Sequence, residues 1–156
     1  MSGNARFQYE LEPILLSRQW ALDALKLDLS KVNEQLRDLR QQLSDLEKVA
    51  ALTVQEWKQH SGGQELISIE RHMVIARYMD DLAQQCSAKE ISIKETDMQR
   101  EQLIDQIAHA QRGLEAIEKH RSQMKENFTK LALSHDFKQA DDHWSTLQSR
   151  AEYHGN

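Results

Sequence analysis

Residues that interrupt helices are scarce in this chain. Its 156 residues include only one proline and five glycines, which leaves room for long stretches of regular structure. Aromatic residues make up 6% of the sequence and charged residues 29%. So polar a composition argues against a thick globular core and favours long, thin helices.

Cysteine, net positive charge and long apolar runs are also lacking. Cys86 is the only cysteine, which excludes an intrachain disulfide and fits a reducing cytosol. The net charge of −5 argues against a nucleic-acid partner, because phosphate binding needs a concentrated basic face. No apolar run is long enough for a membrane span, and the first residues lack a signal-peptide pattern. We therefore expect a cytoplasmic protein without direct membrane insertion.

A regular apolar seam organises the first half of the chain. Its positions are separated alternately by three and four residues, which averages 3.5 residues per turn and is typical of a left-handed coiled coil. One such helix cannot bury its seam alone, so the spacing predicts a partner helix. The seam positions are Leu22, Leu25, Leu29, Val32, Leu36, Leu39, Leu43, Leu46, Ala50, Thr53 and Trp57.

A second seam with the same spacing follows later in the chain. Lys89, Thr96 and Arg100 make its middle polar, which lowers stability and helps to fix the register. Its positions are Ile75, Met79, Leu82, Cys86, Lys89, Ile93, Thr96, Arg100, Leu103, Ile107, Ala110, Leu114, Ile117, Arg121, Met124, Phe128 and Leu131.

The segment His60-Ser61-Gly62-Gly63 separates the two seams, and adjacent glycines are a strong helix-stop signal. We predict helices at about 13–59 and 65–134, joined by a turn at about 60–64. A short link makes the helices antiparallel neighbours. The predicted fold is therefore all-α, a two-stranded antiparallel coiled-coil hairpin that forms a single elongated domain over residues 1–156.

The alternative to the hairpin is a parallel homodimer of one long helix, which the two glycines would weaken. If the turn is centred near Gly62, residue i faces roughly residue 124 − i, and the first helix starts opposite residue 111. The second helix then extends beyond its partner, and Phe7, Tyr9 and Leu11 of the N-terminal segment could cover the first half of that overhang.

The apolar pattern changes phase after Leu131. Phe137, Ala140, Trp144, Leu147 and Ala151 form a new 3–4 series, which predicts a short C-terminal helix or a tail over residues 135–156. This segment either folds back over the overhang or continues as a loose tail.

Catalytic motifs are missing from the sequence. It has no phosphate-binding glycine loop, no nucleophile elbow and no two-histidine zinc motif. A dense His/Asp group is better explained as the solvated, acidic first turn of a short helix than as a metal site. We therefore expect an interaction protein rather than an enzyme, with no cofactor and no metal. The group consists of His135, Asp136, Asp141, Asp142 and His143.

Three surfaces are candidates for partner binding. The first is an apolar stripe off the seam of the first helix, formed by Leu16, Trp20 and Leu27, unless a third helix of the chain covers it. The second is the overhang of the second helix, with Met124, Phe128 and Leu131, and Trp144 beyond it. The third is the hairpin tip, where the apolar residues could instead pack on each other. The tip residues are Trp57, Leu66, Ile67, Ile69 and Met73.

The chain resembles the FliJ/YscO family, the central stalk proteins of the export ATPase in bacterial flagellar and type III secretion systems. The similarity lies in the segment Phe7-Gln8-Tyr9-Glu10-Leu11-Glu12-Pro13-Ile14-Leu15-Leu16, a Leu-rich first helix, a turn near residue 62 and a longer second helix. The ending Ala140-Asp141-Asp142-His143-Trp144 with Arg150 also resembles that family, although a smaller apolar residue is expected where Trp144 stands.

This resemblance implies that the terminal ends of the helices insert into the pore of a hexameric export ATPase. It implies that the tip reaches toward an export gate protein, that secretion chaperones are further partners, and that the protein works at the base of a membrane secretion apparatus, in some systems for virulence. Two other functions remain open: a holdase-like or adaptor coiled coil that binds chaperones or unfolded clients, and a structural coiled-coil dimer.

Overall fold

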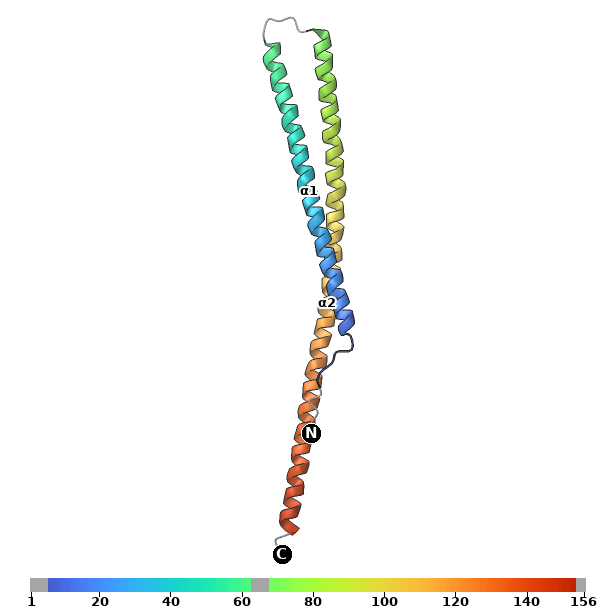
Figure 1. Cartoon of the computed structure of the whole chain (residues 1–156), viewed down its shortest axis with the longest axis vertical. Coiled ribbons are helices and arrows are strands. Elements are labelled where there is room, and N and C mark those ends of the chain that lie inside the picture. The colour runs from blue at the N-terminus through green and yellow to red at the C-terminus, as the bar shows by residue number, and fades with distance from the viewer. Residues whose placement is uncertain (1–5, 63–67, 154–156) are drawn as a thin grey trace. The chain divides into compact units, whose positions relative to one another are not determined.

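The computed structural model describes residues 6–62 and 68–153. These residues form two helices and no strand: α1 spans Glu12–Ser61 and α2 spans Ile69–Tyr153 (Figure 1). The two helices pack against each other as an all-α helical hairpin, which confirms the predicted fold class. Neither helix has a stretch that is both apolar and long enough to span a bilayer within the described ranges.

The helix ends follow from local chemistry. Pro13 lies in the first turn of α1, where its missing N–H costs no hydrogen bond. At the other end of α1, the imidazole of His60 bonds the carbonyl oxygen of Glu56 at 2.8 Å, and α1 stops at Ser61. The Ser68 hydroxyl accepts a hydrogen bond from the Arg71 N–H at 3.2 Å and caps the start of α2.

Helix α2 is longer than predicted. It continues without a break through residue 134 to Tyr153, so the predicted separate short helix or tail is the last part of α2. The physical reason is that residues 114–153 contain neither glycine nor proline. A phase change in the apolar pattern moves the apolar face around the helix, but it leaves the backbone hydrogen bonds intact.

The chain divides into two compact units. The hairpin unit comprises residues 23–108, and the terminal unit comprises residues 1–22 and 109–156. In the hairpin unit, α1 and α2 lie side by side and run antiparallel, since Trp57 near the end of α1 stacks on His72 near the start of α2 at 5.0 Å. Leu36, Leu82 and Thr96 are its most buried side chains.

The predicted seams are confirmed by burial in the hairpin unit. Every seam position from Leu25 to Trp57 on α1, and from Ile75 to Ile107 on α2, is buried or half-buried, while nearly all other side chains are exposed. Ile69, Met73 and Ala76, which lie off the seam near the start of α2, are exposed. The core is therefore a single narrow row of side chains between two helices.

Two polar seam residues of the hairpin unit, Thr96 and Arg100, have partners nearby. The Thr96 hydroxyl donates a hydrogen bond to the carbonyl oxygen of Ser92 at 2.8 Å. Asp97 accepts from Arg100 one turn away at 3.4 Å and lies 3.9 Å from Arg40 on α1. Of these contacts, only the approach of Asp97 to Arg40 joins the two helices and so bears on their register.

In the terminal unit the N-terminal segment packs along α2. The ring of Phe7 lies 5.7 Å from that of Phe128, and the Tyr9 hydroxyl lies 2.8 Å from Nδ1 of His120. This confirms the prediction that the N-terminal segment covers part of the overhang. Leu15, Leu22 and Leu114 form the buried seam of this unit.

Two arginines of the terminal unit have different surroundings. Arg121 forms an ion pair with Glu12 at 3.0 Å. Arg18 instead lies over Gly113, where the absence of a side chain leaves room for the guanidinium.

The predicted register is wrong in both units. A turn centred on Gly62 would place residue 67 opposite Trp57, which instead stacks on His72. It would place residue 111 opposite the start of α1, whereas Glu12 pairs with Arg121. The physical reason is that the link runs from Gly62 to Ser68, so its centre falls later in the chain and the facing residues move toward the C-terminus.

Candidate functional site

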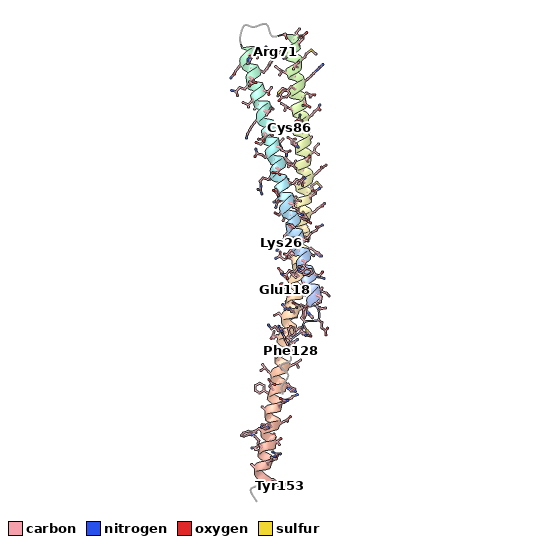
Figure 2. All side chains as sticks on the ribbon, viewed as in Figure 1. Lys26, Arg71, Cys86, Glu118, Phe128 and Tyr153 are labelled. Carbon is pink, nitrogen blue, oxygen red and sulfur yellow. The ribbon has the colours of Figure 1, made fainter. Side chains whose placement is uncertain are left out.

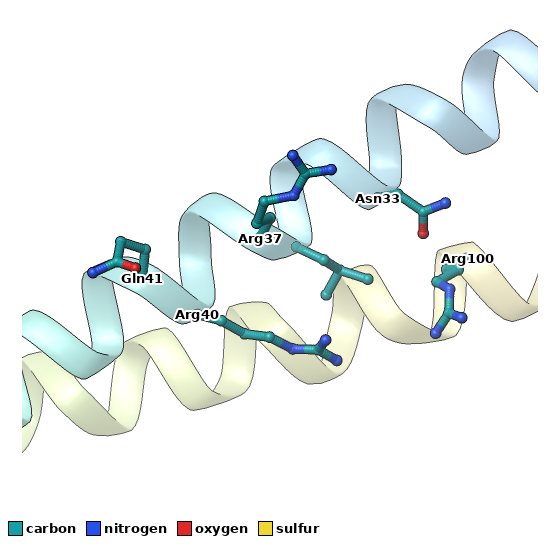
Figure 3. Close-up of a pocket in the computed structure, with 6 residues that line it drawn as sticks. Asn33, Arg37, Arg40, Gln41 and Arg100 are labelled. Carbon is teal, nitrogen blue, oxygen red and sulfur yellow. The ribbon is translucent and has the colours of Figure 1, made fainter.

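One hollow of the described surface has a volume of about 430 Å³. It lies between α1 and α2 in the hairpin unit, where Arg37, Arg40 and Arg100 lie beside Asn33 and Gln41 (Figure 3). Within residues 6–62 and 68–153 no three His, Cys, Asp or Glu side chains lie close enough to hold a metal ion. The features that stand out are exposed apolar side chains.

The largest of these features is the last part of α2. From Thr129 to Tyr153 every side chain that the structure describes is exposed, and Figure 2 shows no other described segment of the terminal unit beside α2 between Phe128 and Tyr153. The exposed fraction is 72% for Leu131, 74% for Phe137 and 63% for Trp144. A helix of this length with large exposed apolar side chains has a surface suited to a partner.

Six apolar side chains of this last part of α2 form a regular stripe, which we call the C-terminal stripe. Its members follow the 3–4 spacing that the seams use, and they lie on nearly the opposite face of α2 from the seam that ends at Phe128. The C-terminal stripe consists of Leu133, Phe137, Ala140, Trp144, Leu147 and Ala151.

Leu133 is a member that the sequence interpretation missed. It is exposed and lies four residues before Phe137 in the same series. Ending the second helix at residue 134 separated it from the later members, although the spacing alone could have revealed it.

The other predicted overhang residues have mixed exposure. Phe128 is half-buried because Phe7 covers it, so only part of its ring is free. Met124 and Leu131 are exposed. The free apolar surface of the terminal unit therefore includes Met124 and Leu131 of the seam as well as the C-terminal stripe.

Charged residues flank the C-terminal stripe. The stripe positions can be labelled a and d of a heptad. In this labelling the g positions beside the stripe are Asp136, His143 and Arg150, and Asp141 is an e position on its other side. Just before the stripe, Lys130 approaches Glu126 to 2.7 Å. The hydrogen bond and the positive charge from Lys130 lower the pKa of Glu126.

The predicted surface on α1 is also exposed. Trp20 is 70% exposed and Leu16 is exposed beside it in the terminal unit, while Leu27 is 58% exposed in the hairpin unit. The alternative was a C-terminal helix folded back over this stripe. That alternative is wrong for the described residues, because residues 135–153 continue α2 instead of folding back.

The predicted tip residues that the structure describes differ in exposure. Trp57 is half-buried against His72, whereas Ile69 and Met73 are exposed. Val74 and Tyr78 on the same helix are exposed as well and were missed, because they lie off the seam. Leu66 and Ile67 lie outside the described residues.

The geometry therefore offers surfaces for helical or extended partners. Comparison of the chain with known protein families, with curated proteins and with solved structures finds no match.

Proposed function

We propose that this chain is the central stalk protein of a bacterial export ATPase, in a flagellar or type III secretion system. In this function the terminal unit inserts into the pore of the ATPase hexamer, and the tip of the hairpin unit contacts an export gate protein or secretion chaperones. The proposal rests on the resemblance to the FliJ/YscO family and places the protein in the cytoplasm at the base of the secretion apparatus.

The observation that carries the proposal is the exposed C-terminal stripe. The terminal unit leaves Phe137, Trp144 and Leu147 free on the last part of α2 and Trp20 free on α1. Large aromatic side chains are the residues most often found at the centre of protein interfaces. A pore lined by several subunits can bury such side chains, which water alone solvates poorly.

The mechanism would be mechanical and allosteric. An asymmetric pair of helices inside a sixfold ring contacts some subunit interfaces better than others. Differential contact shifts the populations of the ring's states and so biases the ATP cycle. The stalk itself needs no catalytic group for this role.

Binding to a purified hexameric export ATPase tests the proposal. Two variants remove the candidate surface, Trp20→Ala and a truncation after Leu131. Both sites are exposed, so circular dichroism is expected to show that the remaining helices persist. We expect each variant to weaken binding at least about tenfold, as loss of an interface hot spot does.

A matched control is Ile91→Ala, which removes an exposed apolar side chain from the hairpin unit. It is expected to bind like the wild type. Equal ATPase binding by the wild type, Trp20→Ala and the truncated chain would contradict the stalk function.

The exposed tip favours a second candidate function, an adaptor that binds chaperones or unfolded clients. Ile69, Met73 and Val74 are exposed together in the first two turns of α2. Binding of a secretion chaperone or an unfolded polypeptide without any ATPase, lost in Met73→Ser, would support the adaptor over the stalk.

A further inference from the structure

We propose that the C-terminal stripe binds the same stripe of a second copy of this chain, in an antiparallel arrangement. The inference does not depend on the proposed function. It starts from the position of the stripe on nearly the opposite face from the seam, which leaves the stripe without a partner among the described residues of its own unit.

Side-chain sizes match in an antiparallel pair. In such a pair each a position packs against a d position of the other helix. With the two copies centred on residue 142, Trp144 faces Ala140, Phe137 faces Leu147 and Leu133 faces Ala151. A large side chain therefore meets a smaller one in each layer, which is the arrangement that fills a helix interface without voids or overlap.

Charges also match in this pairing. The g positions of antiparallel helices face each other, so Asp136 of one copy faces Arg150 of the second copy, and the two-fold symmetry forms this pair twice. At the symmetry axis His143 faces its own copy on one flank and Asp141 faces its own copy on the other. The repulsion between the two Asp141 carboxylates weakens the dimer and keeps it reversible.

A parallel pair would fit poorly. Each g position would then face the e position five residues later in the second copy, which brings Asp136 against Asp141 twice. Its layers would oppose Trp144 to Trp144 and Ala140 to Ala140, so one layer is overfilled and the next is left open. Both size and charge thus select the antiparallel orientation.

The interface is short, so the dimer forms only at moderate concentration. The stripe spans residues 133–151, which is about 27 Å of helix. Coiled coils of so few turns are marginal in water. Dimerisation would cover the stripe when no other partner is bound, and a partner that takes the stripe would dissociate the dimer.

Sedimentation equilibrium of the full chain between about 1 and 500 µM tests the proposal. We expect a concentration-dependent dimer. The single variants Asp136→Arg and Arg150→Asp should each weaken the dimer about tenfold, because two attractive pairs become repulsive. The double variant Asp136→Arg with Arg150→Asp should restore the dissociation constant to within about threefold of the wild type, since it recreates the pairs in reverse.

The control is Asp142→Arg, which changes the same charge at a position that faces away from the second copy. It should leave the dissociation constant within about twofold of the wild type. A chain that stays monomeric at 500 µM would overturn the proposal, as would a double variant no stronger than the single ones. A dimer that Asp136→Arg strengthens would show the parallel arrangement and overturn it too.

Discussion

Truncation of Leu36 tests whether the narrow seam holds the hairpin unit together. Leu36 is 3% exposed and lies at the centre of the seam on α1. A Leu→Ala change in a protein core costs about 2–5 kcal/mol. The flanking seam residues are only half-buried and can move into the space, so we expect the lower end, about 2–3 kcal/mol.

The measurement is urea unfolding followed by circular dichroism at 222 nm. With a slope of about 2 kcal/mol per M of urea, the loss corresponds to a midpoint lowered by about 1–1.5 M. The slope itself should stay unchanged, because the truncation removes packing and leaves the surface exposed on unfolding nearly the same.

Leu27→Ala is the matched control. It makes the same chemical change on the same helix, but Leu27 is 58% exposed. Its free energy of unfolding should change by no more than about 0.5 kcal/mol. Equal destabilisation by Leu27→Ala and Leu36→Ala would refute the reasoning, and so would a Leu36→Ala variant as stable as the wild type.

Two further predictions concern the terminal unit. Gly113→Ala should raise the free energy of unfolding by about 0.5–1 kcal/mol, since alanine favours a helix interior over glycine. A Cβ there would meet Nη1 of Arg18 at 2.7 Å and Cζ at 3.9 Å, both at the end of a flexible side chain that can move aside, and urea unfolding checks the sign. Lys130→Gln should raise the pKa of Glu126 back toward its ordinary 4.5, because the lowering comes from the hydrogen bond and charge of Lys130. That ion pair stabilises the helix above pH 4.5 and is lost as the pH falls through the lowered pKa, and an NMR titration of both chains shows the difference; identical titration curves would contradict it.

The seam was predictable from the sequence because burial between two helices follows residue spacing. A side chain at a 3–4 position must face the partner helix, whichever residue of the partner lies opposite. Leu36 and Leu82 are therefore buried where the spacing predicts, and even the polar Thr96 is buried because its position is in the series.

The register was not predictable, because a coiled-coil pattern repeats every seven residues. Sliding one helix by a heptad brings the same kinds of residues together, so the apolar pattern alone does not choose between the alternatives. The register is fixed by the length of the link and by particular contacts, such as the stacking of Trp57 on His72 and the ion pair of Glu12 with Arg121. These contacts join residues far apart in the chain.

The candidate site, too, was predictable from the sequence only in part. The amino-acid sequence by itself determined that Phe137, Trp144 and Leu147 share one face of a helix, because helical spacing is a local property. Only the tertiary structure decided that no described residue of the terminal unit covers this face. The described part of the N-terminal segment packs on the seam as far as Phe128, and the phase change then turns the apolar face away from it.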